Sequence, residues 1–164
     1  MKNDIIKFLL DCPKVVTVKP KRYVYQDQRS NYTMRNEFAC VSLNGEHKFE
    51  VFMRFNTELS FVFSIGLVYH SKEGDITIAR YNGKHNHKNK VADHDEFSDF
   101  HIHMLYDIQL TDDTADSIDA KETDKYITYD EALFAFLNDC NIQNWQTYFP
   151  DLENKINQLK IEGV

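Results

Sequence analysis

The chain has 164 residues, of which 42% are hydrophobic and 13% aromatic, and its formal net charge is −7. This length and composition predict one globular domain, residues 1–164, with a core of its own. The acidic balance argues against direct binding of duplex nucleic acid, because phosphate binding requires a surplus of Lys and Arg. The sequence holds no run of about 18 apolar residues, so we expect no membrane-spanning helix.

The three cysteines and the N-terminus bear on the compartment. The number of cysteines is odd and no Cys-x-x-Cys pair occurs, which favours reduced thiols. The apolar run near the N-terminus is too short for a signal peptide and is interrupted by Asp4 and Asp11. We therefore expect a cytoplasmic protein, located in the host cytoplasm if a phage encodes it.

The first third of the chain predicts a short helix followed by strand and loop. Residues 3–11 have Asn3 as a candidate N-cap, and Pro13 ends the pattern. Val15–Val18 predicts a short strand, and the polar residues 26–33 predict a loop. The apolar stripe of the helix consists of Ile5, Ile6, Leu9 and Leu10.

In the middle of the chain, apolar and polar residues alternate with a period of two. Lys48–Asn56, Phe61–His70 and Ile76–Tyr81 each place every second residue on an apolar face. Asn44-Gly45 predicts a hairpin between two strands, and Ser71–Asp75 predicts a turn. This pattern indicates an antiparallel meander with one face on the core.

The segment after this meander is polar and then helical. Residues 82–99 predict a loop, Phe100–Leu105 a strand, and the acidic stretch Asp107–Asp124 a second loop. Thr128 and Glu131 form a capping box that begins a helix over Tyr129–Cys140. Residues 151–160 predict a last helix. The fold class is therefore α+β: an antiparallel meander covered on one face by C-terminal helices, with a short N-terminal helix.

Histidines gather unusually between residues 85 and 103, where five of the seven occur. His101 and His103 are neighbours on one strand face, and an extended His85-Asn86-His87 would place two more rings together. Neutral imidazole is the commonest metal-binding side chain, so Zn²⁺ or another borderline metal is a possible cofactor. Two alternatives stay open, namely solvent-facing histidines and a structural cluster that hydrogen-bonds loop backbone. The candidate metal ligands are His85, His87, His101 and His103.

The same segment suggests acid–base chemistry. Basic groups beside histidine can hold a phosphate while an imidazole exchanges protons near neutral pH. His101, His103 and Lys84 are the candidate catalytic residues, with Arg80 nearby in sequence. The alternative is a charged loop that is simply solvated.

A protein-binding role has its own candidates. Tyr23, Tyr25, Tyr32 and Arg35 are the residue types that dominate interface energetics. The acidic stretch could dock on a basic partner through Asp112, Asp113, Asp116 and Asp119.

A resemblance adds to these observations. The chain contains Arg80-Tyr81-Asn82-Gly83, then His85, His87 and Asn89, then Asp99-Phe100-His101-Ile102-His103, and later Tyr126 and Asp139-Cys140-Asn141-Ile142. Over residues 45–142 this pattern resembles a family of uncharacterised bacterial and prophage proteins, which implies that His85, His87, His101 and His103 are the positions to test. The chain departs from the pattern in its longer acidic segment before Tyr126. By size and charge alone it is also similar to anti-CRISPR inhibitors, which implies a protein partner.

Two hypotheses follow, beside a structural alternative in which the histidine cluster is a stabilising metal clip and binding occurs elsewhere. The first is a non-enzymatic inhibitor without a cofactor that binds a basic nuclease effector such as Cas9. The second is a histidine-dependent hydrolase, with or without a metal, such as a toxin-type endoribonuclease. The acidic net charge favours the first.

Overall fold

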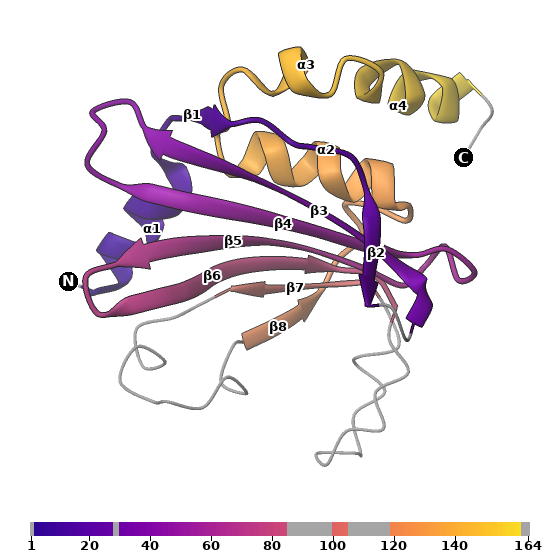
Figure 1. The fold of residues 1–164 in the computed structure, drawn as a ribbon, viewed down its shortest axis with the longest axis horizontal. Helices are drawn as coiled ribbons and strands as arrows, with labels where there is room; N and C mark the ends of the chain where they lie inside the picture. The colour runs from indigo at the N-terminus through magenta and orange to yellow at the C-terminus, as the bar shows by residue number, and fades with distance from the viewer. Residues whose placement is uncertain (1, 28–29, 85–99, 105–118, 162–164) are drawn as a thin grey trace.

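The computed structural model describes residues 2–27, 30–84, 100–104 and 119–161, and it confirms the α+β class. Eight strands form one antiparallel sheet, and helices lie before and after it in the chain (Figure 1). None of the helices within these ranges is long and apolar enough to cross a membrane. The elements are α1 Lys2–Asp11, β1 Lys14–Val18, β2 Val24–Asp27, β3 Ser30–Ser42, β4 Lys48–Asn56, β5 Phe63–Ser71, β6 Gly74–Asn82, β7 His101–Met104, β8 Asp119–Glu122, α2 Tyr129–Asp139, α3 Trp145–Tyr148 and α4 Leu152–Ile161.

The sheet is the predicted meander with a divided edge. From β3 to β8 each strand pairs antiparallel with the next one along the chain. β1 and β2 both pair with β3, β1 near its end and β2 near its beginning, so together they act as one interrupted edge strand. The Asn44-Gly45 turn joins β3 to β4, and Gly45 adopts the positive φ of 77° that such turns require.

The core lies between the sheet and the C-terminal helices. Every second residue of β4 and β5 points into it, as the alternation predicts. α2 packs on β5 and β6, and α3 and α4 lie on the outer side of α2 (Figure 1). The buried residues of β4, β5 and α2 are Phe49, Val51, Met53, Phe63, Ile65, Leu67, Ala132, Leu133, Phe136 and Leu137.

Helix α2 begins and ends at local sequence signals. The Glu131 amide donates to Thr128 Oγ1 at 3.1 Å, which confirms Thr128 as the N-cap, and the Thr128 hydroxyl donates to Glu131 Oε1 at 3.1 Å. At the other end Asn141 takes a left-handed φ of 56°, and the Ile142 amide donates to the Leu137 carbonyl at 3.0 Å. This Schellman motif turns the chain sharply and buries Ile142. The Asp-Cys-Asn-Ile sequence therefore has a structural reason.

Four details of the sequence prediction are wrong. Residues 26–33 are not a loop, because β2 and β3 cover most of them as an edge hairpin whose polar residues suit a solvated strand. Asp119–Glu122 is not part of a loop, because it pairs with β7 as strand β8. β5 begins at Phe63, which leaves Phe61 42% exposed, and Ile5 of the predicted helical stripe is 54% exposed.

Candidate functional site

His101 and His103 form a close pair inside the protein. Successive side chains of β7 point to alternate faces of the sheet, so both rings lie on one face and Ile102 on the other. The ring centroids are 4.8 Å apart, and the ring planes are nearly perpendicular at 71°. Their exposed fractions are 1% and 9%. This burial rules out, for these two residues, the interpretation of histidines that decorate a solvated surface.

Neighbouring strands hold this histidine pair in place. His101 stands opposite Asn82 on β6 and His103 opposite Arg80, and Asn82 Nδ2 lies 3.5 Å from His101 Nε2. The Tyr126 hydroxyl donates to the backbone carbonyls of Asn82 at 2.8 Å and His101 at 2.9 Å. Burial raises the pKa of Tyr126, so its hydroxyl keeps its proton and ties β6 to β7.

The other histidine-site candidates are only partly placed. Lys84 Nζ lies 5.5 Å from the centroid of the Phe100 ring, next to the start of β7. His85 and His87 lie outside the described residues, so the structure does not place the four-histidine metal site. Within the described ranges, no group of three His, Cys, Asp or Glu side chains is arranged to hold a metal ion.

The acidic docking candidates are also mostly outside the described residues. Asp112, Asp113 and Asp116 are among those not described. The backbone of Asp119 pairs with Met104 in β8, which ties one end of the acidic segment to the sheet.

Two of the predicted tyrosine anchors share an exposed surface. Tyr25 pairs with Met34, which pairs with Phe55, so all three side chains point to the face covered by the helices. Tyr32, two residues before Met34, points the same way. Tyr25 and Tyr32 are 55% and 51% exposed because they lie on the β2–β3 hairpin, beyond the helices. We call Tyr25 and Tyr32 the hairpin tyrosines.

The other two predicted anchors behave differently. Arg35 stands opposite Arg54 on the far face of the sheet and makes an exposed 3.8 Å ion pair with Glu37. Tyr23 is half-buried, and its hydroxyl lies 2.6 Å from that of Tyr129. Burial raises the pKa of both tyrosines, so both stay neutral at physiological pH. Tyr23 therefore packs against Tyr129 and is not an exposed anchor.

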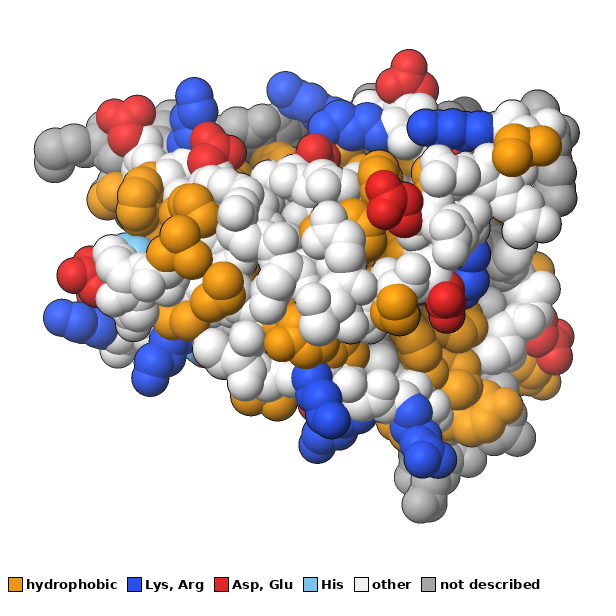
Figure 2. Space-filling view, turned by 90° about the horizontal axis from the view of Figure 1, so that it is seen from above, with side chains coloured by type: hydrophobic (Ala, Val, Ile, Leu, Met, Phe, Trp, Pro, Cys, Tyr) orange, Lys and Arg blue, Asp and Glu red, His pale blue; other side chains and the backbone are white. Residues whose placement is uncertain are grey.

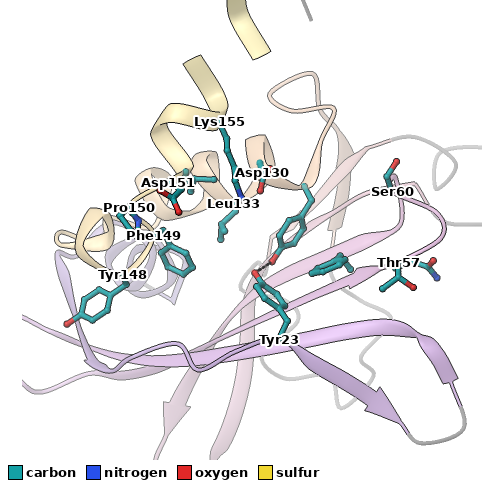
Figure 3. A pocket seen from close by; sticks show the side chains of 14 residues that line it. Tyr23, Thr57, Ser60, Asp130, Leu133, Tyr148, Phe149, Pro150, Asp151 and Lys155 are labelled. Carbon is teal, nitrogen blue, oxygen red and sulfur yellow. Dashed lines mark hydrogen bonds between the residues drawn. The ribbon is translucent and has the colours of Figure 1, made fainter. Parts of the chain in front are cut away.

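A pocket of about 660 Å³ opens beside this tyrosine pair. It lies between the end of β4, the beginning of α2 and the connection from α3 to α4 (Figure 3). Aromatic and apolar side chains make most of its wall, and a few polar groups accompany them, which is the usual make-up of a binding pocket. The apolar and aromatic lining consists of Tyr23, Phe55, Tyr129, Leu133, Tyr148, Phe149, Pro150 and Leu152, and the charged lining of Asp130, Asp151 and Lys155.

Sequence reasoning missed this pocket. Its residues come from four separate segments, and each has an ordinary role in its own segment. The signal that could have found it is the density of aromatic residues around the termini of the last helices.

Sequence reasoning also missed Lys14, which is completely buried. Its ammonium donates to the carbonyls of Leu10 and Cys12, both at 2.9 Å, and of Cys140 at 2.8 Å. It also lies 4.8 Å from the centroid of the Phe49 ring. Lys14 thus joins the ends of α1 and α2 under the sheet edge, which is a structural role.

The cysteines beside Lys14 are not poised for chemistry. All three are buried, and burial raises the pKa of the Cys40 and Cys140 thiols to about 12. A thiol with such a pKa holds almost no thiolate near neutral pH, so these residues are packing groups rather than nucleophiles.

The candidate surface for function is thus the pocket together with the hairpin tyrosines, and the buried histidine pair is a second candidate. No protein-family model matches this chain, and neither a curated protein nor a solved structure matches it.

Proposed function

We propose that this protein acts by binding another protein, and that the pocket and the hairpin tyrosines together receive a basic side chain of the partner. The observation that carries the proposal is the pocket itself, an aromatic-walled cavity with two carboxylates that lies on the same face as two exposed tyrosines. Well-packed pockets flanked by Tyr are where binding energy concentrates in protein interfaces.

The charges of the pocket favour a cation. Asp130 and Asp151 contribute two negative charges against the single positive charge of Lys155. Figure 3 shows Asp130 and Asp151 on either side of Leu133, above the tyrosine pair. A guanidinium can stack on the Tyr and Phe rings while it donates hydrogen bonds to a carboxylate. An arginine of the partner fits this combination better than an acidic or apolar side chain.

The hairpin tyrosines would widen the interface around the pocket. Tyr combines a large apolar ring with a hydroxyl, at low cost in side-chain entropy, and is enriched in interfaces. β2 pairs only with β3, so within the described part of the chain its outer edge carries no further strand. The outer edge of β1, in contrast, forms a parallel bridge from Lys14 to Ile142. Figure 2 shows the surface of the protein from the side of α3 and α4. Hydrophobic side chains lie on it in separate groups, and Lys and Arg side chains lie mainly near the margins of this view.

Catalysis by the described candidates has less support. A general acid or base must come within hydrogen-bonding reach of its substrate, whereas His101 and His103 are 1% and 9% exposed. The raised pKa values of Cys40 and Cys140 likewise oppose a nucleophilic cysteine. Binding is therefore the better-supported function.

The net charge of −7 favours a basic partner. A nuclease effector that handles nucleic acid is basic where the phosphates pass, and an acidic protein bound there would block it. The finer proposal is therefore an anti-defence inhibitor of the anti-CRISPR kind.

Biolayer interferometry against guide-loaded Cas9, used as the probe effector, tests this proposal. Tyr25→Ala/Tyr32→Ala and Asp130→Asn/Asp151→Asn should each weaken binding by roughly tenfold or more, as expected for interface hot spots. Leu43→Ala and Asp4→Asn are matched controls, because Leu43 is 64% exposed on the β3–β4 turn and Asp4 is exposed on α1. Neither control should change the affinity.

A parallel assay measures RNA cleavage by the protein itself, in the native form and as His101→Gln/His103→Gln. Cleavage that disappears in the double variant, with its circular dichroism unchanged, would establish the hydrolase instead. The conservative change to Gln matters because both imidazoles are buried.

A further inference from the structure

Three arginines gather on the sheet face that α2 does not cover. Arg35 on β3 stands directly opposite Arg54 on β4, and Arg80 on β6 stands opposite Gly66 on β5, the strand between β4 and β6. Residues that are paired or two apart share a face, which puts all three guanidinium groups above the same part of the sheet. We call Arg35, Arg54 and Arg80 the arginine cluster.

The cluster concentrates positive charge in an acidic protein. In the described part of the chain, no carboxylate lies within 4.0 Å of the guanidinium nitrogens of Arg54 or Arg80, and Arg35 has only the long 3.8 Å contact with Glu37. Burial, followed by repulsion from the neighbouring arginine, lowers the pKa of both Arg54 and Arg80. Holding the charges of Arg54 and Arg80 together without a close carboxylate costs free energy that a bound anion would recover.

Three hydrogen-bonding groups at the same place are buried without a partner among the residues that the structure describes. They are Arg80 Nε, Ser64 Oγ and Asn82 Oδ1, and Asn82 stands on β6 directly opposite Ser64. Ser64 lies on β5 directly opposite Arg54, so it lies within the cluster. Buried polar groups in native proteins nearly always have hydrogen-bond partners, so an exception requires an explanation, and a bound ligand is one such explanation.

An aromatic ring forms the floor of the cluster. The Phe52 ring lies over Gly66, where a Cβ would come within 2.1 Å of Phe52 Cζ. The Arg54 guanidinium lies on the Phe52 ring, 4.5 Å from its centroid. A stacked guanidinium is restrained before the ligand arrives, which reduces the entropy lost on binding.

We infer that the arginine cluster binds a phosphate-type oxyanion, with Arg54 and Arg80 as its principal ligands and Ser64 as a hydroxyl donor. Two guanidinium groups can each present a pair of N–H groups to phosphate oxygens, and this planar fork matches phosphate better than lysine does. The site lies on the sheet face opposite the pocket and is independent of the proposed protein partner.

Calorimetric titration with inorganic phosphate, in a chloride buffer of constant ionic strength, tests this inference. Native protein should bind phosphate, and Arg80→Gln and Arg54→Gln should each weaken binding by roughly tenfold or more, the effect of losing a charge-assisted hydrogen bond. Arg22→Gln, an exposed arginine between β1 and β2, removes the same charge and should leave the affinity within about twofold. Ser64→Ala changes no charge and should weaken binding while the protein stays folded.

A second arm identifies the source of the phosphate. Adenosine monophosphate, adenosine and a single-stranded oligonucleotide are titrated alongside inorganic phosphate. Binding of the nucleotide but not of the nucleoside supports a phosphorylated metabolite at the same cluster. The inference is overturned if neither phosphate nor the nucleotide binds, if Arg22→Gln weakens binding as much as Arg80→Gln does, or if only a single-stranded oligonucleotide binds.

Discussion

Replacing Lys14 by Met tests how the ends of α1 and α2 are joined. The substitution keeps a long unbranched side chain, one atom shorter, but removes the donor of three hydrogen bonds, to the carbonyls of Leu10, Cys12 and Cys140. A buried acceptor left without its donor costs about 1–3 kcal/mol, so the two buried carbonyls, of Cys12 and Cys140, cost about 2–6 kcal/mol, and the partly buried Leu10 carbonyl adds to this. Removing a buried ammonium returns several kcal/mol of desolvation free energy. We expect a net loss of about 3 kcal/mol in the free energy of unfolding.

Urea unfolding followed by far-UV circular dichroism measures this loss, which is a large share of the roughly 5–15 kcal/mol that holds a typical domain together. Lys7→Met is the matched control, because Lys7 is exposed on the same helix and should change stability by less than about 0.5 kcal/mol. A loss below about 1 kcal/mol for Lys14→Met would refute the idea that these carbonyls depend on the ammonium.

Three further predictions concern the sheet and the thiols. Gly83→Ala should destabilise the protein by about 2–4 kcal/mol, because the new Cβ meets the Phe61 carbonyl oxygen at 2.0 Å. Gly66→Ala should cost only about 1 kcal/mol, because its Cβ meets the Phe52 ring, which can move. Equal losses in urea unfolding would contradict this difference. The three cysteines should resist a thiol-labelling reagent at pH 8 in the folded protein and react in urea, and rapid labelling of the native protein would count against their burial. The folded-state pKa of Cys40 and Cys140 is raised from 9.0 to about 12, so their contribution to stability is complete below pH 9 and lost as the pH rises toward about 12. Urea midpoints measured at rising pH should fall across this window, and constant midpoints would contradict the shift.

Local sequence signals predicted the elements that local interactions determine. The N-cap at Thr128 begins α2 where the sequence places it, because Thr128 and Glu131 lie within one helical turn. Alternation predicted β4 and the core face of β5, because a strand buried on one side must repeat with a period of two. The same reasoning placed His101 and His103 side by side.

Long-range convergence explains what the sequence did not reveal. Lys14 and Cys140 are 126 positions apart, and nothing near Lys14 indicates that a helix end will meet it. The polar composition of residues 26–33 indicates a loop, but an edge hairpin tolerates polar residues because one of its faces meets water. The arginine cluster arises only from the register of β3, β4, β5 and β6, and register depends on the whole sheet.

The central claim is that this protein works by binding a basic protein partner. Its most direct test is a titration of DNA cleavage by guide-loaded Cas9 with the native protein and with the Asp130→Asn/Asp151→Asn variant. We predict that cleavage declines as native protein approaches equimolar amounts and persists with the variant. Undiminished cleavage with an excess of native protein, or equal inhibition by both forms, would contradict the account.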